Sequence, residues 1–287
     1  MSTSLHTQHE RSFHDNRFVY PVLSRRSGGI SIGVNLNPDK VCNFDCIYCQ
    51  VDRTTTSETR FVEMEQLLSE LDGMLELVGS QRLYDDDKFS VTPIELRRLN
   101  DIAFSGDGEP TTYRNFDDIM AKCAEVKQKH ARDDVKMVLI TNATMFHRPH
   151  VQRGLEILDE NQGEIWAKLE AGTEPYFKLV ERTKIPFAQV LDNIALAAKQ
   201  RPLVIQSLFM KIHNEPPTSE ELQAFCDRLE DVLTSGGAIE MVQVYTVARQ
   251  PAESFVTSLE DAQVDAIVQM VRERTGICAK AYYGVAS

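Results

Sequence analysis

The chain has 287 residues, which corresponds to one large domain or two small ones at about 150 residues per domain. Its 43 acidic residues outnumber 31 Lys and Arg residues, for a net charge of −12, and this balance disfavours a nucleic acid bound through bulk charge. The composition is 42% hydrophobic, and no apolar run approaches the ~20 residues that cross a bilayer, which excludes a membrane protein.

The first residues carry no export signal. Residues 1–18 are polar, so we expect a flexible N-terminal tail followed by one domain over residues 19–287, in the cytoplasm. Cysteines in a reducing compartment should be thiols or metal ligands. Three of the six, Cys42, Cys46 and Cys49, lie within eight residues.

Strand and helix patterns alternate along the rest of the chain. Apolar residues at period two predict a strand over residues 29–36, and apolar residues at helical spacing predict a helix over residues 61–78. Further strands are predicted at 102–105, 136–141, 165–169, 203–209 and 239–246, and further helices at 116–130, 149–160, 187–199, 219–233 and 259–274. Six such units predict an α/β fold with a parallel sheet, either an incomplete barrel or a doubly wound sheet. Both place the chemistry at the carboxyl ends of the strands.

The cysteine cluster follows the first of these strands. The segment Cys42-Asn-Phe-Asp-Cys46-Ile-Tyr-Cys49 offers three thiolates, whereas structural zinc requires four ligands and the closest histidine in sequence is His14. A [4Fe–4S] cube held by three thiolates leaves one iron open to a ligand from outside the protein. The segment therefore favours an iron–sulfur cluster over zinc or unrelated thiols.

A glycine-rich turn follows the second predicted strand. In Ser105-Gly106-Asp107-Gly108-Glu109-Pro110-Thr111 the glycines allow a ligand to approach the backbone, and the carboxylate of Glu109 can hold an ammonium group. A surface turn without a ligand is the alternative.

These two motifs resemble the signatures of the radical S-adenosylmethionine (SAM) superfamily. That family carries C-x3-C-x2-C with an aromatic residue before the last cysteine, and usually Gly-Gly-Glu after the second strand; here Asp107 stands where the first glycine of that triplet is common. The resemblance implies a partial (β/α)6 TIM-like barrel with parallel strands. It also implies Cys42, Cys46 and Cys49 as cluster ligands, Tyr48 beside the adenine, and Gly108 and Glu109 at the methionine amino group.

The same resemblance implies the activity. A reduced [4Fe–4S] cluster would cleave SAM to methionine and a 5′-deoxyadenosyl radical, which abstracts a hydrogen atom from a substrate. An electron donor such as a flavodoxin or ferredoxin is then the expected protein partner. A non-catalytic iron–sulfur or zinc adaptor is the alternative from a different functional class.

Polar residues at later strand ends complete the candidate cofactor site. Thr141-Asn142-Ala143-Thr144 is similar to a Thr-Asn-Gly segment that many members carry beside the cofactor, which implicates Asn142. Lys168 and Glu170 share one strand face, where a cofactor contact competes with a salt bridge between the two. Gln206 interrupts an apolar strand, so its amide needs partners in either the adenosyl or substrate cavity or the core. Gln243 and Tyr245 are weaker candidates for substrate contact.

The substrate stays open at this stage. The order of segments resembles small radical proteins grouped with the wyosine-base tRNA synthases. The candidates are a tRNA base, a protein glycyl residue or a small metabolite, and the acidic balance weakens the first because phosphate contacts supply much nucleic-acid affinity.

Overall fold

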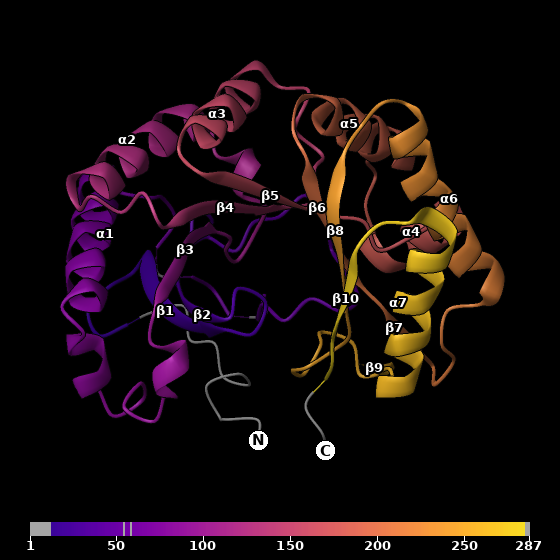
Figure 1. The fold of residues 1–287 in the computed structure, drawn as a ribbon, viewed down its shortest axis with the longest axis horizontal. Helices are drawn as coiled ribbons and strands as arrows, with labels where there is room; N and C mark the ends of the chain where they lie inside the picture. The colour runs from indigo at the N-terminus through magenta and orange to yellow at the C-terminus, as the bar shows by residue number, and fades with distance from the viewer. Residues whose placement is uncertain (1–12, 54, 58, 285–287) are drawn as a thin grey trace. The chain divides into compact units, whose positions relative to one another are not determined.

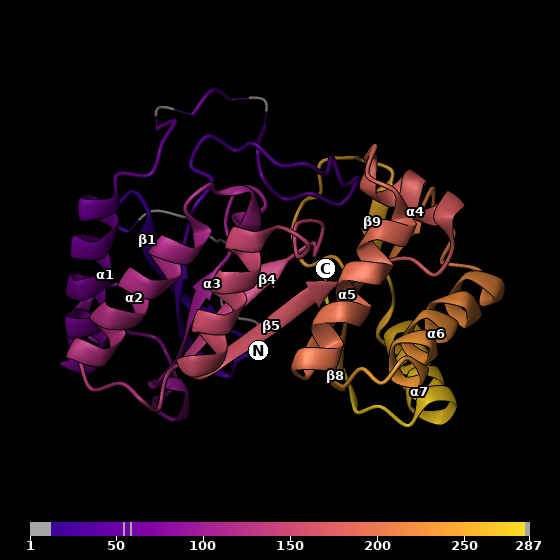
Figure 2. The same ribbon diagram turned by 90° about the horizontal axis from the view of Figure 1, so that it is seen from above.

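The computed structural model describes residues 13–53, 55–57 and 59–284. The chain forms two compact units. The first comprises Met1–Cys42, Arg53–Ile140 and Arg148–Glu164, and the second comprises Asn43–Asp52, Thr141–His147 and Ile165–Ser287. Each unit is built mainly from parallel strands with helices packed along them (Figures 1 and 2).

The first unit begins with an antiparallel pair and continues in parallel. Its strands are β1 (Val19–Ser24), β2 (Gly29–Val34), β3 (Leu99–Phe104) and β4 (Lys136–Thr141). The last residue of β4, Thr141, already belongs to the second unit. β1 pairs antiparallel with β2, whereas β2, β3 and β4 are parallel neighbours. Its helices are α1 (Met64–Gly79), α2 (Phe116–Lys129) and α3 (Pro149–Glu160). In Figure 1 these three helices lie in sequence along one side of the strands.

The second unit continues the parallel arrangement. Its strands are β5 (Gly163–Lys168), β6 (Leu203–Leu208), β8 (Ile239–Tyr245) and β10 (Ala279–Tyr282), and its helices are α4 (Glu174–Glu181), α5 (Phe187–Gln200), α6 (Ser219–Thr234) and α7 (Asp261–Thr275). β5, β6, β8 and β10 pair in parallel in that order. β7 (Met210–Ile212) and β9 (Val256–Ser258) form a separate antiparallel pair. The first two residues of β5 belong to the first unit.

The predicted alternation of strands and helices is confirmed. β4 and α3 occupy the predicted residues, and the other predicted elements are present with shifted ends. The sequence did not indicate β1, α4, β7, β9 or β10. Among the described residues, no helix is long and apolar enough to cross a membrane.

The N-terminal segment joins the first unit before β1 begins. Residues 1–12 of the predicted tail lie outside the described residues. Phe18 is fully buried, and Glu70 on α1 accepts hydrogen bonds from the backbone N–H groups of Arg17, Phe18 and Val19 at 3.0, 2.8 and 3.0 Å. One buried carboxylate therefore fixes the entry of the chain into β1.

Candidate functional site

The cysteine segment is split between the two units. Cys42 is the last residue of the first unit's N-terminal segment, and Cys46 and Cys49 belong to the second unit. All three are half-buried, and none is part of a disulfide among the described residues. A turn closes between the latter two, because Cys49 N–H donates to Cys46 C=O at 3.0 Å.

Two distant segments of the second unit hold this part of the loop by its backbone. Ile47 N–H donates to Val180 C=O on α4 at 2.9 Å, and Ala252 N–H donates to Cys49 C=O at 2.7 Å. Ile47 and Tyr48 also pack in a hydrophobic cluster with residues of α4, β6, β7 and β9. The positions of Cys46 and Cys49 are thus set by elements far along the chain, and α4 was not predicted.

The Cys46 thiol contacts a buried carboxyl group. Cys46 Sγ lies 2.7 Å from Glu181 Oε2, at the end of α4, and Glu181 is 1% exposed. Burial, and next the charge of Glu181, raise the pKa of the Cys46 thiol well above its usual value. Burial, and next the neighbouring Glu170, likewise raise the pKa of Glu181. The environment therefore favours the neutral form of both groups. Sequence reasoning missed Glu181, because nothing in its local pattern relates it to the cysteines.

Lys168, at the end of β5, links Tyr48 to Glu170. Its Nζ lies 3.3 Å from the Tyr48 hydroxyl and 3.9 Å from Glu170 Oε1. Burial alone would lower the pKa of Lys168, but the acidic groups of Tyr245 and Glu170 raise it overall. Burial raises the pKa of the Tyr48 phenol. The salt bridge that the sequence left open is therefore present, and it lies directly beside the cysteine segment.

The ion pair with Lys168 leaves Glu170 Oε1 able to accept a hydrogen bond. This oxygen is buried and accepts no hydrogen bond within the described part of the chain. A buried carboxylate oxygen without a donor costs free energy, and a ligand hydroxyl is a suitable donor. The other predicted polar strand residue, Gln206, is buried and donates from Nε2 to Gln243 Oε1 at 3.1 Å.

Asn142 connects the end of β4 to the cysteine segment. Its Nδ2 donates to Asn43 Oδ1 at 2.7 Å, and its Oδ1 accepts from the Thr144 hydroxyl at 2.7 Å. Ala143 has a φ of 60°, in the left-handed region that glycine adopts with least strain. That conformation explains why a glycine suits this position in the similar Thr-Asn-Gly segment.

The glycine-rich turn lies in the first unit and packs on the loop that precedes Cys42. A Cβ atom on Gly106 would lie 2.2 Å from Asn35 Oδ1, and one on Gly108 would lie 2.1 Å from the Val41 carbonyl oxygen. Both positions therefore exclude larger side chains through protein contacts alone. Asn35 Nδ2 also donates to Asp107 Oδ2 at 2.7 Å, so the aspartate at the divergent position supports the same loop.

Glu109 ends this turn as a buried cap. It is 3% exposed, and its Oε1 accepts from Thr111 N–H at 3.1 Å and from the Thr111 hydroxyl at 2.5 Å. It precedes a short 3-10 helix, Pro110–Thr112. The carboxylate is thus held in a fixed orientation by its own turn.

The three cysteines supply soft sulfur ligands of the kind that an iron–sulfur cluster requires. Three cysteines occur at C-x3-C-x2-C spacing, and soft thiolate ligands select iron–sulfur clusters or zinc. Within the described ranges, no three His, Cys, Asp or Glu side chains are close enough together to hold a single metal ion.

Comparison with known families identifies the chain. The family model described as "Radical SAM superfamily" matches residues 36–229, which is more than half of the chain and includes the cysteine segment and the glycine-rich turn. The chain belongs to the radical SAM superfamily. It is accordingly an enzyme, and the cofactors of this superfamily are a [4Fe–4S] cluster and SAM.

Two curated relatives are similar to this radical SAM chain. A protein of Brachyspira hyodysenteriae named GTPase Obg is 23% identical over 256 residues, covering 87% of this chain and 32% of that protein. A UPF0026 protein of Helicobacter pylori strain J99 is 26% identical over 224 residues, covering 75% of this chain and 62% of that protein. The chain thus spans less than two thirds of the length of either relative.

Two solved structures share the radical SAM fold. A structure of TYW1 with a lysine-pyruvate adduct bound has a TM-score of 0.53 at 13% identity, covering 91% of this chain and 78% of that one. Streptococcus suis SuiB bound to S-adenosylmethionine has a TM-score of 0.57 at 12% identity, covering 90% of this chain and 52% of that one. These likenesses confirm the expected fold class, a partial barrel of parallel strands and helices.

Proposed function

We propose that this radical SAM enzyme binds a [4Fe–4S] cluster through Cys42, Cys46 and Cys49 and cleaves SAM reductively to abstract a hydrogen atom from its substrate. The observation that carries the proposal is the C-x3-C-x2-C segment inside the matched family region. None of the three cysteines is part of a disulfide among the described residues. The family membership favours this enzyme over the alternative of a non-catalytic adaptor.

The remaining predicted residues would bind SAM. Buried and fixed by Thr111, Glu109 offers a carboxylate for the methionine amino group, and the Gly108 backbone lies beside it. Tyr48 would lie beside the adenine. Glu170 Oε1, which accepts no hydrogen bond within the described part of the chain, suits a ribose hydroxyl, and Lys168 Nζ at 3.9 Å orients that carboxylate. Asn142 and Gln206 would complete the cofactor contacts.

The protein's own task is to position groups and exclude water. When bound, the cluster supplies one electron that cleaves the sulfonium of SAM to methionine and a 5′-deoxyadenosyl radical. The backbone bonds at Ile47 and Cys49 fix the loop that carries two of the ligands. A fixed loop is required because the reacting atoms must be held close together and shielded from solvent.

The substrate and the electron donor are the open parts of this function. Radical SAM enzymes require a reductant and a substrate, and we propose a flavodoxin or ferredoxin as the donor. Among a tRNA base, a protein glycyl residue and a small metabolite, the net charge of −12 disfavours the tRNA base and leaves the other two as candidates.

Anaerobic reconstitution tests this function. The wild type, reconstituted with iron and sulfide and supplied with dithionite and SAM, should form 5′-deoxyadenosine. Cys46→Ser should lose cluster iron and reduce this product at least 100-fold, because serine does not replace a thiolate ligand of the cluster. Iron content and product are measured on the same samples.

The matched control is Cys278→Ser. Cys278 is an exposed thiol near β10, outside the motif, so the same replacement there should leave iron and product at wild-type amounts. Retention of full iron content and turnover by Cys46→Ser would overturn the assignment.

A further inference from the structure

Asp107 places a side chain at the position of the glycine-rich turn where the radical SAM family commonly has the first glycine of its triplet. A Cβ atom at Gly106 or Gly108 would collide with the loop that precedes Cys42. The backbone of Asp107, by contrast, lies outside the left-handed region, so its conformation does not require glycine. The presence of a carboxylate at this position therefore needs an explanation of its own.

Asn35, the residue after β2, connects this carboxylate to the backbone. Its Nδ2 donates to Asp107 Oδ2 at 2.7 Å, and its Oδ1 accepts from the N–H groups of Asp107 at 3.2 Å and of Asn37 at 3.0 Å. Because backbone N–H groups only donate, the amide oxygen must face them and the amide nitrogen faces the carboxylate. Asn35 is 2% exposed, so solvent does not compete for these bonds.

A second asparagine holds the far side of the turn. Asn37 Nδ2 donates to the Thr112 hydroxyl oxygen at 3.3 Å, and a Cβ atom on Gly108 would lie 2.8 Å from Asn37 Cβ. The Thr112 hydroxyl in turn donates to the Glu109 carbonyl oxygen at 2.7 Å. The turn and the segment that leads to Cys42 therefore pack together within the first unit.

We propose that Asp107 is a positioning residue for SAM and acts through Asn35. The carboxylate orients the Asn35 amide, which holds the backbone of residue 107 next to Gly108 and Glu109. Under the proposed function, on which this inference rests, those two residues bind the methionine amino group of SAM. The glycine that is common in the family would remove the acceptor of Asn35 Nδ2 and would therefore weaken SAM binding in this chain.

Equilibrium dialysis of SAM against the reconstituted, unreduced enzyme tests the inference. Asp107→Gly should bind SAM about tenfold more weakly, which corresponds to about 1.4 kcal/mol. Its iron content should equal that of the wild type, because the three cysteines are unchanged. Asp107→Asn keeps an oxygen that can accept from Asn35 Nδ2, and its affinity should lie within about threefold of the wild type. Asp87→Gly, at an exposed aspartate in another turn of the same unit, is the control and should bind SAM like the wild type.

Turnover separates positioning from a general loss of structure. With dithionite as the reductant, Asp107→Gly should raise KM for SAM about tenfold and leave kcat for 5′-deoxyadenosine within about threefold, because saturating SAM compensates for weaker binding. A variant that is merely misfolded would lose active enzyme, so both kcat and iron content would fall.

Hydrogen exchange measures the Asn35–Asp107 contact without SAM. In Asp107→Gly the backbone amides of residues 35–37 and 105–109 should exchange faster than in the wild type, whereas those of α3 should be unchanged. Unchanged exchange in the first two segments would show that the contact does not hold the turn.

Three further results would overturn the inference. Equal SAM affinity in Asp107→Gly and the wild type would show that the contact does not position the cofactor. Equal weakening in Asp107→Gly and Asp107→Asn would assign the effect to the charge of Asp107 rather than to its bond with Asn35. A wild type that binds no SAM would reject the proposed function together with the inference, whereas the first two results leave that function intact.

Discussion

Buried charged side chains in the first unit differ in how well they are satisfied. Lys127 is fully buried, and its Nζ donates to the carbonyl oxygens of Val135 and Asn161 at 2.8 and 2.9 Å and to the Gln162 side chain. Asp101 on β3 is 3% exposed and accepts a hydrogen bond from the Ser31 hydroxyl. Burial outweighs that bond and raises the pKa of Asp101 to about 6.

The raised pKa of Asp101 predicts a pH-dependent stability. The unfolded chain releases this proton near pH 4, whereas the folded chain keeps it until about pH 6. The group's contribution is therefore complete below pH 4, is lost as pH rises from 4 to 6, and stays constant above that. The loss amounts to about 2–3 kcal/mol. Asp101→Asn should abolish this part of the slope and be more stable than the wild type at pH 7.

Urea unfolding at several pH values between 4 and 7.5 measures the effect. Asp133→Asn, at an exposed aspartate of the same unit, serves as the control and should follow the wild-type profile. If Asp101→Asn had the same pH profile of stability as the wild type, the prediction would be contradicted, because ionisation of Asp101 would then not lower the free energy of unfolding.

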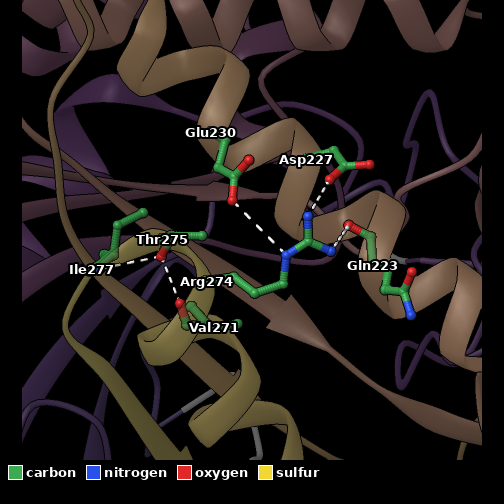
Figure 3. Close-up of polar contacts among 7 residues, drawn as sticks. All are labelled: Gln223, Asp227, Glu230, Val271, Arg274, Thr275 and Ile277. Carbon is green, nitrogen blue, oxygen red and sulfur yellow. Dashed lines mark hydrogen bonds and ion pairs between the residues drawn. The ribbon is translucent and has the colours of Figure 1, made fainter.

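At the scale of elements, α6 makes one buried and one exposed set of polar contacts. Glu221 accepts from Gly172 N–H at 2.5 Å and from the Thr173 hydroxyl at 2.6 Å, and Thr173 is the N-cap of α4. On the outer side, Arg274 of α7 lies 2.7 Å from Asp227 and 3.9 Å from Glu230 of α6 (Figure 3). The buried carboxylate therefore positions the helix whose far end holds the cysteine segment.

The two sets should differ in what they contribute to stability. Glu221→Ala leaves buried donors unsatisfied and should lower the free energy of unfolding by about 2–3 kcal/mol. Arg274→Ala breaks half-exposed ion pairs and should cost about 1 kcal/mol or less. Urea denaturation of both variants provides the comparison, and equal losses would contradict it.

At the scale of the whole molecule, the dominant property is charge. With 43 acidic and 31 basic residues, the net charge is −12. Binding to phosphate backbones is driven by basic side chains that release counterions from the phosphates, so an acidic protein gains little from this release and is repelled by the phosphates. This repulsion acts on any long nucleic acid, whereas a single nucleobase or small amide experiences little of it.

Bulk tRNA should therefore bind weakly. We expect a Kd weaker than about 100 µM at about 0.15 M salt, measured by filter binding with total tRNA. A Kd of about 1 µM or tighter that weakens steeply with salt would reveal a local basic surface and would restore tRNA as a substrate candidate.

Local patterns in the sequence predict much of the fold. α3 was predicted at its observed bounds because its apolar residues repeat at helical spacing, and β4 because it is a short continuous apolar run, which is typical of a buried parallel strand. β10 and α4 escaped prediction because they are short, at four and eight residues, so few repeats are available to reveal a period. β1 was missed because its own sequence shows no clear strand pattern. It is recognised as a strand by its antiparallel pairing with β2.

The sequence by itself determined the superfamily motifs, the alternation of strands and helices, and the acidic character of the chain. Only the tertiary structure showed that Glu181 contacts Cys46, that Ala252 holds Cys49, and that Gln206 pairs with Gln243. Periodicity and motif spacing report on neighbours along the chain. Hydrogen bonds between residues tens of positions apart form only when parallel strands and the helices between them bring those residues together.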